Sequence, residues 1–152
     1  MPVDRGHVAE NDAERERLRS LVTRLSDEEL RRQMPAGWTV AAVLAHVGFW
    51  DARALYWLDT WEHGTEPATP DYESPDDVVW INESAKPLCL ALAPRAAAQL
   101  ALGLAEDTDR KVEALSDEML TKVEAMGGPP FNLSRAEHRG EHLDDIVRAL
   151  SE

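Results

Sequence analysis

Apolar side chains recur at intervals of three and four residues along most of the chain, the spacing of one face of an α-helix. In residues 9–25 this face consists of Leu18, Leu21, Val22 and Leu25. After Thr39 it consists of Val43, Val47, Trp50, Ala54, Trp57 and Trp61. Further along it comprises Leu100, Leu104, Val112 and Leu115, and near the end Leu143, Ile146 and Leu150. The chain has no pair of alternating β-branched runs that would predict a hairpin. An all-α fold is therefore predicted.

Start and stop signals divide the first half of this pattern into elements. The sequence from Ser26 to Glu29 has the form of a capping box and predicts a short helical turn after the first helix. Residues 35–39 form a predicted turn that ends in the N-cap residue Thr39, and a helix of roughly six turns follows. Residues 64–73 are rich in Gly, Pro, Thr and acidic side chains and predict a loop.

In the second half of the chain, proline and glycine mark the predicted boundaries of the helices. Ser74 and Pro75 predict the start of a third helix, which Pro87 and Pro94 break or kink before it resumes at Pro94. Residues 117–128 are ambiguous, and residues 127–130 form a break. The sequence from Ser134 to Glu137 has the form of a second capping box and predicts the start of the last helix. Four main helices with polar loops predict a single domain over residues 1–152, an antiparallel four-helix bundle.

Charge and cysteine content narrow the classes of partner. The chain carries 29 acidic and 16 basic residues, a net charge of -13, which repels nucleic-acid phosphates and anionic membrane surfaces. The N-terminus has no apolar segment typical of a signal peptide, and Pro94, Arg95 and Gln99 interrupt the most apolar run. Cys89, the single cysteine, excludes an internal disulfide and is interpreted as a small buried apolar residue. We expect a cytoplasmic protein that binds neither nucleic acid nor membrane.

The predicted last helix contains the spacing of a metal site. His138 and His142 are separated by about 40° around the helix axis and about 6 Å along it, so both imidazoles can reach one ion. Five histidines scattered over the chain also produce such a pair by chance. His46 lies at the edge of the aromatic face of the second main helix, where its alternative role is a buried neutral histidine with a satisfied hydrogen bond.

Helical bundles build metal sites from inward side chains on facing helices, which makes the three histidines one candidate site. His46, His138 and His142 would form a mononuclear His₃ site with an open position for water. Neither a His-Glu-x-x-His zinc motif nor a Glu-x-x-His di-iron motif occurs in the chain. Glu137, Glu141 and Asp144 are predicted to face solvent, and His7 and His63 are interpreted as surface residues.

Two stretches resemble the DinB-like superfamily, which includes the metal-binding domain of mycothiol-dependent maleylpyruvate isomerase and related thiol-dependent transferases. They are "LSDEELRRQMPAGWTVAAVLAHVGFW" (residues 25–50) and "SRAEHRGEHLDDI" (residues 134–146). The resemblance implies a four-helix bundle with one divalent ion bound by His46, His138 and His142. Zinc is the expected ion, with nickel and iron as alternatives that imidazole ligands also suit. The resemblance further implies that the ion activates a low-molecular-weight thiol of the mycothiol or bacillithiol class.

Two functions follow as hypotheses. The first is a metal-dependent enzyme that uses a small thiol and a small electrophilic substrate for S-transfer or isomerisation. The second is a non-catalytic metal-binding or ligand-binding bundle, for which the tryptophan-rich helix could line a pocket or a homodimer seam. Arg53 lies further along the His46 face, where it could bind an anionic substrate or serve only as a surface arginine whose stem covers apolar side chains.

Overall fold

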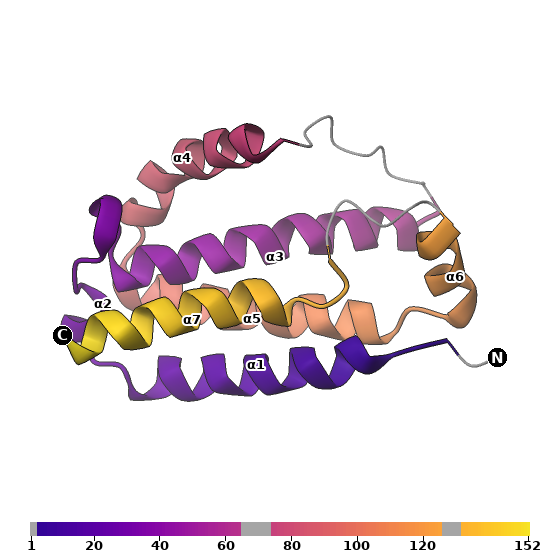
Figure 1. The fold of residues 1–152 in the computed structure, drawn as a ribbon, viewed down its shortest axis with the longest axis horizontal. Coiled ribbons are helices and arrows are strands. Elements are labelled where there is room, and N and C mark those ends of the chain that lie inside the picture. The colour runs from indigo at the N-terminus through magenta and orange to yellow at the C-terminus, as the bar shows by residue number, and fades with distance from the viewer. Residues whose placement is uncertain (1–2, 65–73, 126–131) are drawn as a thin grey trace.

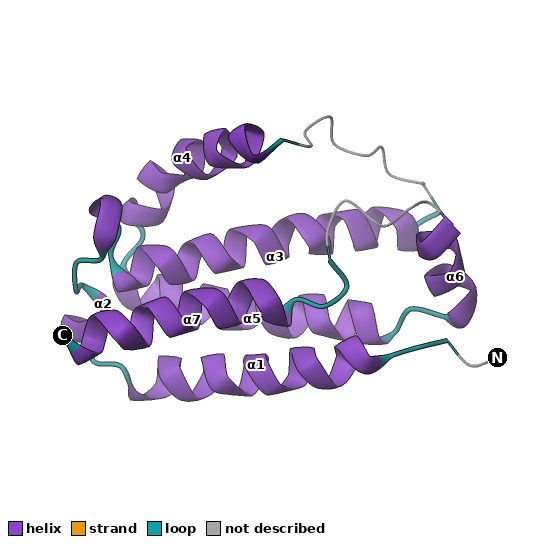
Figure 2. Cartoon of the chain, in the orientation of Figure 1, coloured by secondary structure: helices purple, strands orange, loops and turns teal. Residues whose placement is uncertain are grey.

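A computed structural model describes residues 3–64, 74–125 and 132–152 of the chain. Within these ranges the regular elements are all helical, apart from an isolated β-bridge between Gln33 and Thr39 (Figure 2). The elements are α1 (Gly6–Arg24), α2 (Asp27–Leu30), the 3₁₀ turn η1 (Pro35–Gly37), α3 (Val40–Glu62), α4 (Pro75–Ala91), α5 (Pro94–Glu113), α6 (Asp117–Ala125) and α7 (Ala136–Ser151). The all-α prediction is thus confirmed for the described residues, while the single domain stays a prediction.

Three of the four predicted helix starts are confirmed by their side-chain caps. Ser26 and Ser74 each form a capping box with the residue three positions later. The Thr39 hydroxyl accepts a hydrogen bond from the backbone N–H of Ala42 at 3.1 Å, which fixes the start of α3. Each cap satisfies N–H groups that have no partner in the first turn, so these starts are encoded locally.

The predicted capping box at the start of the last helix is wrong. The N-cap of α7 is Arg135, which makes no side-chain capping bond. The Ser134 hydroxyl instead donates to a carboxylate oxygen of Glu10 on α1, at 2.7 Å. A bond to a neighbouring helix has therefore replaced the local one, and it attaches the start of α7 to α1.

The predicted third helix is two helices. The chain runs helically through Pro87 and turns at Leu92 and Ala93, whose ψ angles of 140° and 132° are extended. Pro94 explains the turn, since proline disfavours the helical conformation in the residue before it and fits the first position of a new helix. Helix α4 folds back along α3, and the turn before Pro94 then sends α5 in the same direction as α3 (Figure 1). The predicted loop at residues 64–73, except Gly64, and the predicted break at residues 127–130 lie outside the described residues.

The core lies between α1, α3, α5 and α7, whose axes are aligned along the length of the molecule (Figure 1). Helix α3 packs most extensively on α5, where Gly48 and a row of buried alanines permit close approach: a Cβ at Gly48 would lie 3.3 Å from the Cα of Ala101. Leu100, by contrast, remains 47% exposed. The four-helix bundle arrangement itself stays a prediction.

Helix α4 packs against α3 and buries one residue, Cys89. This confirms the interpretation of the single cysteine as a small buried apolar residue, and burial raises the pKa of its thiol. None of the described helices combines the length and the apolarity needed to cross a membrane.

Candidate metal centre

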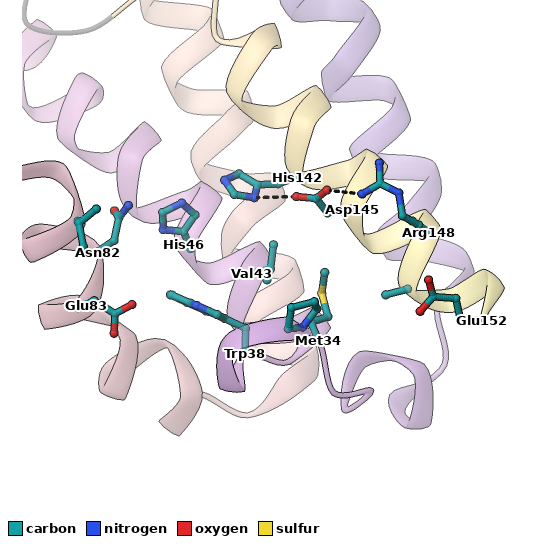
Figure 3. Close-up of a pocket in the computed structure, with 13 residues that line it drawn as sticks. Met34, Trp38, Val43, His46, Asn82, Glu83, His142, Asp145, Arg148 and Glu152 are labelled. Atoms are coloured by element: carbon teal, nitrogen blue, oxygen red, sulfur yellow. Dashed lines mark hydrogen bonds and ion pairs between the residues drawn. The ribbon is translucent and has the colours of Figure 1, made fainter. Parts of the chain in front are cut away.

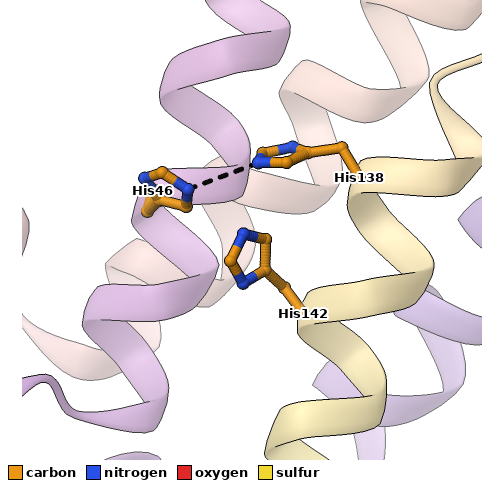
Figure 4. A group of neighbouring side chains, drawn as sticks. All are labelled: His46, His138 and His142. Atoms are coloured by element: carbon orange, nitrogen blue, oxygen red, sulfur yellow. Dashed lines mark hydrogen bonds between the residues drawn. The ribbon is translucent and has the colours of Figure 1, made fainter. Parts of the chain in front are cut away.

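The three predicted histidines meet between α3 and α7 (Figure 4). His46 on α3 is 7% exposed, and His138 and His142 on α7 are half-buried. The Nε2 atoms of His46 and His138 are 3.3 Å apart. The ring centroid of His142 lies 4.7 Å from those of both other histidines. One nitrogen from each imidazole can be chosen so that all three lie within 4.8 Å of one another.

Helix geometry explains how the sequence produces this cluster. His138 and His142 occupy one face of α7 because a step of four residues returns to nearly the same angle. His46 belongs to the almost continuously buried first half of α3, so its side chain points into the protein. Exposed side chains at Glu137, Glu141 and Asp144 on α7 confirm that these acids face solvent.

Burial keeps the three imidazoles neutral. Desolvation, supported by the nearby His142, lowers the pKa of His46 from 6.5 to about 4. Desolvation also lowers the pKa of His138 to about 3, assisted by both other histidines and by Arg135 and Arg139. The pKa of His142 is lowered by desolvation as well, with Asp145 and Glu141 opposing the shift. Neutral imidazoles have the nitrogen lone pair that a metal ion requires.

The donor set fits a divalent ion. Metal–nitrogen distances of about 2.0–2.1 Å in tetrahedral geometry place ligand nitrogens about 3.3 Å apart. The separation between His46 Nε2 and His138 Nε2 equals this edge. The largest separation within the set, 4.8 Å, exceeds it, so a side chain must rotate inward to close the site. Three histidines would also leave a fourth position open, the arrangement typical of catalytic zinc sites.

A cavity of about 400 Å³ adjoins this cluster (Figure 3). His46 and His142 line it, whereas His138 does not, so the cavity meets the cluster from one side. Trp38 forms part of the apolar wall, with its ring edge-on to His46 at a centroid distance of 5.6 Å. The turn that carries Trp38 depends on Gly37, whose φ of 78° is costly for other residues.

Two charged residues of α7 follow His142 along the cavity wall (Figure 3). An Asp145 carboxylate oxygen lies 4.0 Å from Nδ1 of His142, and the Arg148 guanidinium pairs with the same carboxylate at 3.0 Å. Asp145 is therefore placed near the nitrogen that an outer carboxylate would orient if Nε2 were the ligand. Asp145 was absent from the predicted site, although its spacing of three from His142 is a usable signal.

A buried ion network beside the histidines was also missed. Its members are Asp51 on α3, Asp109 on α5, Arg15 on α1, and Arg135 and Arg139 at the start of α7. Arg139 is 1% exposed and donates to both carboxylates. The sequence did contain a signal for this network, namely charged residues within the apolar helical faces. Arg139 precedes Leu143 by four residues and Asp51 follows Val47 by four, so each charged side chain shares a face with a core residue.

The remaining predicted residues lie elsewhere. The Arg53 guanidinium stacks on Trp50, 5.0 Å from the ring centroid, and is outside the residues that line the cavity. His63 is exposed at the end of α3, as predicted. His7 differs from its prediction as a surface residue of the terminus: it is half-buried in the first turn of α1, and burial lowers its pKa.

Comparison with protein families gives one match. The model of the DinB superfamily matches residues 10–143, which include all three histidines of the cluster. Comparison with curated proteins and with solved structures gave no match. Since the family match spans most of the 152 residues, the chain belongs to the DinB superfamily.

Proposed function

We propose that the protein binds one divalent metal ion through His46, His138 and His142 and uses it to activate a small thiol. The observation that carries the proposal is the convergence of three neutral imidazoles from two helices, two of which line a cavity. The proposal includes the four-helix bundle formed by α1, α3, α5 and α7, in which α3 and α7 contribute the ligands. Zinc is the expected ion, and nickel and iron are the alternatives.

The side chains around the cluster have separable roles in this proposal. His46 and His142 line the cavity, so an ion held between them would be reachable by a ligand from the cavity. Trp38, Met34 and Val43 form an apolar wall that lowers the local dielectric constant and limits access of water. Asp145 orients the imidazole of His142 once the 4.0 Å separation closes to a hydrogen bond.

A bound divalent ion lowers the pKa of a coordinated thiol or water and so supplies a nucleophile at neutral pH. The proposed substrates are a low-molecular-weight thiol of the mycothiol or bacillithiol class and a small electrophile. The proposed reaction is S-transfer or isomerisation. A cavity of about 400 Å³ falls within the size range of small-molecule sites in proteins.

The metal-binding part is tested by elemental analysis of protein made without a metal-affinity tag. We expect close to one divalent ion per chain, and a large loss of metal in His46→Ala and His142→Ala. His63→Ala is the matched control, because His63 is exposed and follows the end of α3, 17 residues after His46. Wild-type protein that carries no more metal than His46→Ala would overturn the proposal.

The catalytic part is tested by the consumption of free thiol. Metal-loaded protein is incubated with mycothiol or bacillithiol and a panel of small electrophiles, and metal-free protein serves as the blank. Metal-dependent loss of thiol that His142→Ala lacks supports the enzyme. A full complement of metal without turnover on any electrophile would favour a non-catalytic metal-binding protein instead.

A further inference from the structure

The carboxylate of Asp51 connects α3 to α7 inside the protein. Its Oδ1 accepts a hydrogen bond from Arg135 Nε at 2.9 Å. Its Oδ2 accepts from Nε and Nη2 of Arg139 at 3.2 and 3.1 Å. Asp51 and Arg139 are both 1% exposed and Arg135 is 7% exposed, so water cannot replace these bonds. One side chain of α3 thus holds two arginines of α7 that lie one turn apart.

The same two helices carry the histidine cluster. His46 precedes Asp51 by five residues on α3, and His138 lies between Arg135 and Arg139 on α7. Any displacement of α7 along α3 moves the ion bridge and the histidines together. A slip of one helical turn, about 5.4 Å, would separate the 3.3 Å pair of His46 and His138 completely.

Apolar contacts alone would not set this register with the same precision. Neighbouring apolar side chains can exchange partners at modest cost, whereas a buried carboxylate and guanidinium that separate are left desolvated and unpaired. Two further bonds hold the start of α7 against other helices. Arg139 also pairs with Asp109 on α5 at 2.7 Å, and the Arg135 backbone N–H donates to Asn11 on α1 at 2.6 Å.

We propose that Asp51 is the positioning residue of the histidine cluster: its bridge to Arg135 and Arg139 sets the register of α7 against α3 that brings His138 and His142 to His46. Asp51 touches none of the three histidines in this role and acts through the placement of the helix. The inference rests on the proposed function for its metal-binding readout, and its structural readout is independent of metal.

The test compares Asp51→Asn with Asp109→Asn. Both substitutions neutralise a buried carboxylate that accepts from Arg139, so both perturb the same network. Asp109 lies on α5, however, and pairs with Arg139 and Arg15, so it is outside the bridge between α3 and α7. Comparison of the two variants therefore distinguishes a general loss of stability from a loss of the register between α3 and α7.

The first readout uses metal-free protein. Nuclear Overhauser contacts between the ring protons of His46 and His138 report whether the two imidazoles meet, since their centroids are 5.2 Å apart. We expect these contacts in wild type and in Asp109→Asn and their loss in Asp51→Asn. Their persistence in folded Asp51→Asn overturns the proposal, whatever the metal content of the protein.

The second readout is the affinity for Co²⁺, followed by its visible absorption. Removal of groups that orient metal ligands lowers affinity by about 10- to 100-fold. We expect a loss of this size and an altered spectrum in Asp51→Asn, against at most about a threefold loss in Asp109→Asn. Equal losses in both variants overturn the proposal. If wild type binds no Co²⁺, the proposed metal function fails and the proton contacts alone decide the positioning role.

A second variant covers the case in which Asp51→Asn does not fold. Arg135→Met removes one of the two arginines of the bridge and leaves the bonds between Asp51 and Arg139 in place. We expect weaker contacts between His46 and His138 and an intermediate loss of Co²⁺ affinity. Wild-type values for both readouts in this variant would overturn the proposal.

Discussion

Neutralising Asp51 should remove a large part of the protein's stability, because it unbalances a buried set of charges. This set is the network of Asp51, Asp109, Arg15, Arg135 and Arg139, and its charge is balanced by Asp12, whose side chain is 49% exposed and pairs with Arg15. The change Asp51→Asn leaves one excess positive charge at a position where the two arginines it contacted are at most 7% exposed.

The magnitude follows from the bonds that asparagine cannot replace. Both oxygens of Asp51 accept from guanidinium groups, while the amide of asparagine has one oxygen and presents its N–H₂ to the second arginine. Breaking a buried ion pair by removing one partner costs about 3–5 kcal/mol. This is a large fraction of the roughly 5–15 kcal/mol by which domains are usually stable.

The assay is urea unfolding of metal-free protein, followed by far-ultraviolet circular dichroism. With a slope near 2 kcal/mol per molar urea, about the middle of the usual range, the midpoint should fall by about 1.5–2.5 M. Asp107→Asn is the matched control. Its carboxylate pairs with Arg110 at 3.1 Å, and these side chains are 54% and 73% exposed, so we expect a loss below about 1 kcal/mol.

The reasoning would be refuted by a folded Asp51→Asn protein whose free energy of unfolding falls by no more than that of Asp107→Asn. Such a result would mean that the two arginines of α7 lose little when the carboxylate loses its charge. An unchanged midpoint with a changed slope would be a different outcome, since it would indicate a change in the surface exposed on unfolding.

Three further predictions concern single residues. His46 has a pKa near 6.5 in the unfolded chain and about 4 in the folded protein. Because the unfolded chain is protonated first, the free energy of unfolding of metal-free protein should fall as the pH decreases from about 6.5 to about 4. The loss attributable to His46 is roughly 3 kcal/mol, and urea titrations that give His46→Gln the same pH slope as wild type would contradict it. Gly103→Ala should raise the free energy of unfolding by about 0.5–1 kcal/mol, since its Cβ meets no atom within 4 Å. Gly48→Ala should not, because its Cβ would lie 3.3 Å from Ala101, and an equal gain in both variants would argue against this close approach. Cys89 is 7% exposed with a raised pKa and should react with Ellman's reagent far more slowly in native than in urea-unfolded protein, so rapid reaction of native protein would show that the thiol is accessible.

Local chemistry made most of the helices predictable. Ser26, Thr39 and Ser74 cap the helices that follow them, and each cap involves atoms within three residues of the same chain segment. The predicted capping box at Ser134 is wrong, and Pro87 does not end its helix. The Ser134 hydroxyl bonds to Glu10 in place of its own helix, and the helix continues through Pro87 to the turn before Pro94.

The candidate site likewise has one part that local spacing predicts and another part that depends on tertiary packing. The spacing of His138 and His142 guarantees a shared face on any helix, so this pair was evident from the sequence. Its meeting with His46 was a hypothesis supported by the angle of His46 on its helix and by the resemblance to the DinB-like superfamily. Asp145 and the cavity were outside the prediction, because a cavity is the space left by several packed elements.

The sequence by itself determined the helical content, the capped helix starts, the histidine pair and membership of the DinB superfamily, because these depend on residues near one another along the chain or on recurrent motifs. Tertiary structure decided the return of α4 along α3 and the pairing of Arg139 with Asp51. A charged side chain in the apolar face of a helix is stable only where it forms an ion pair with a side chain of another helix. No local sequence pattern specifies that partner, so the buried network that adjoins the histidines became visible only in the packed structure.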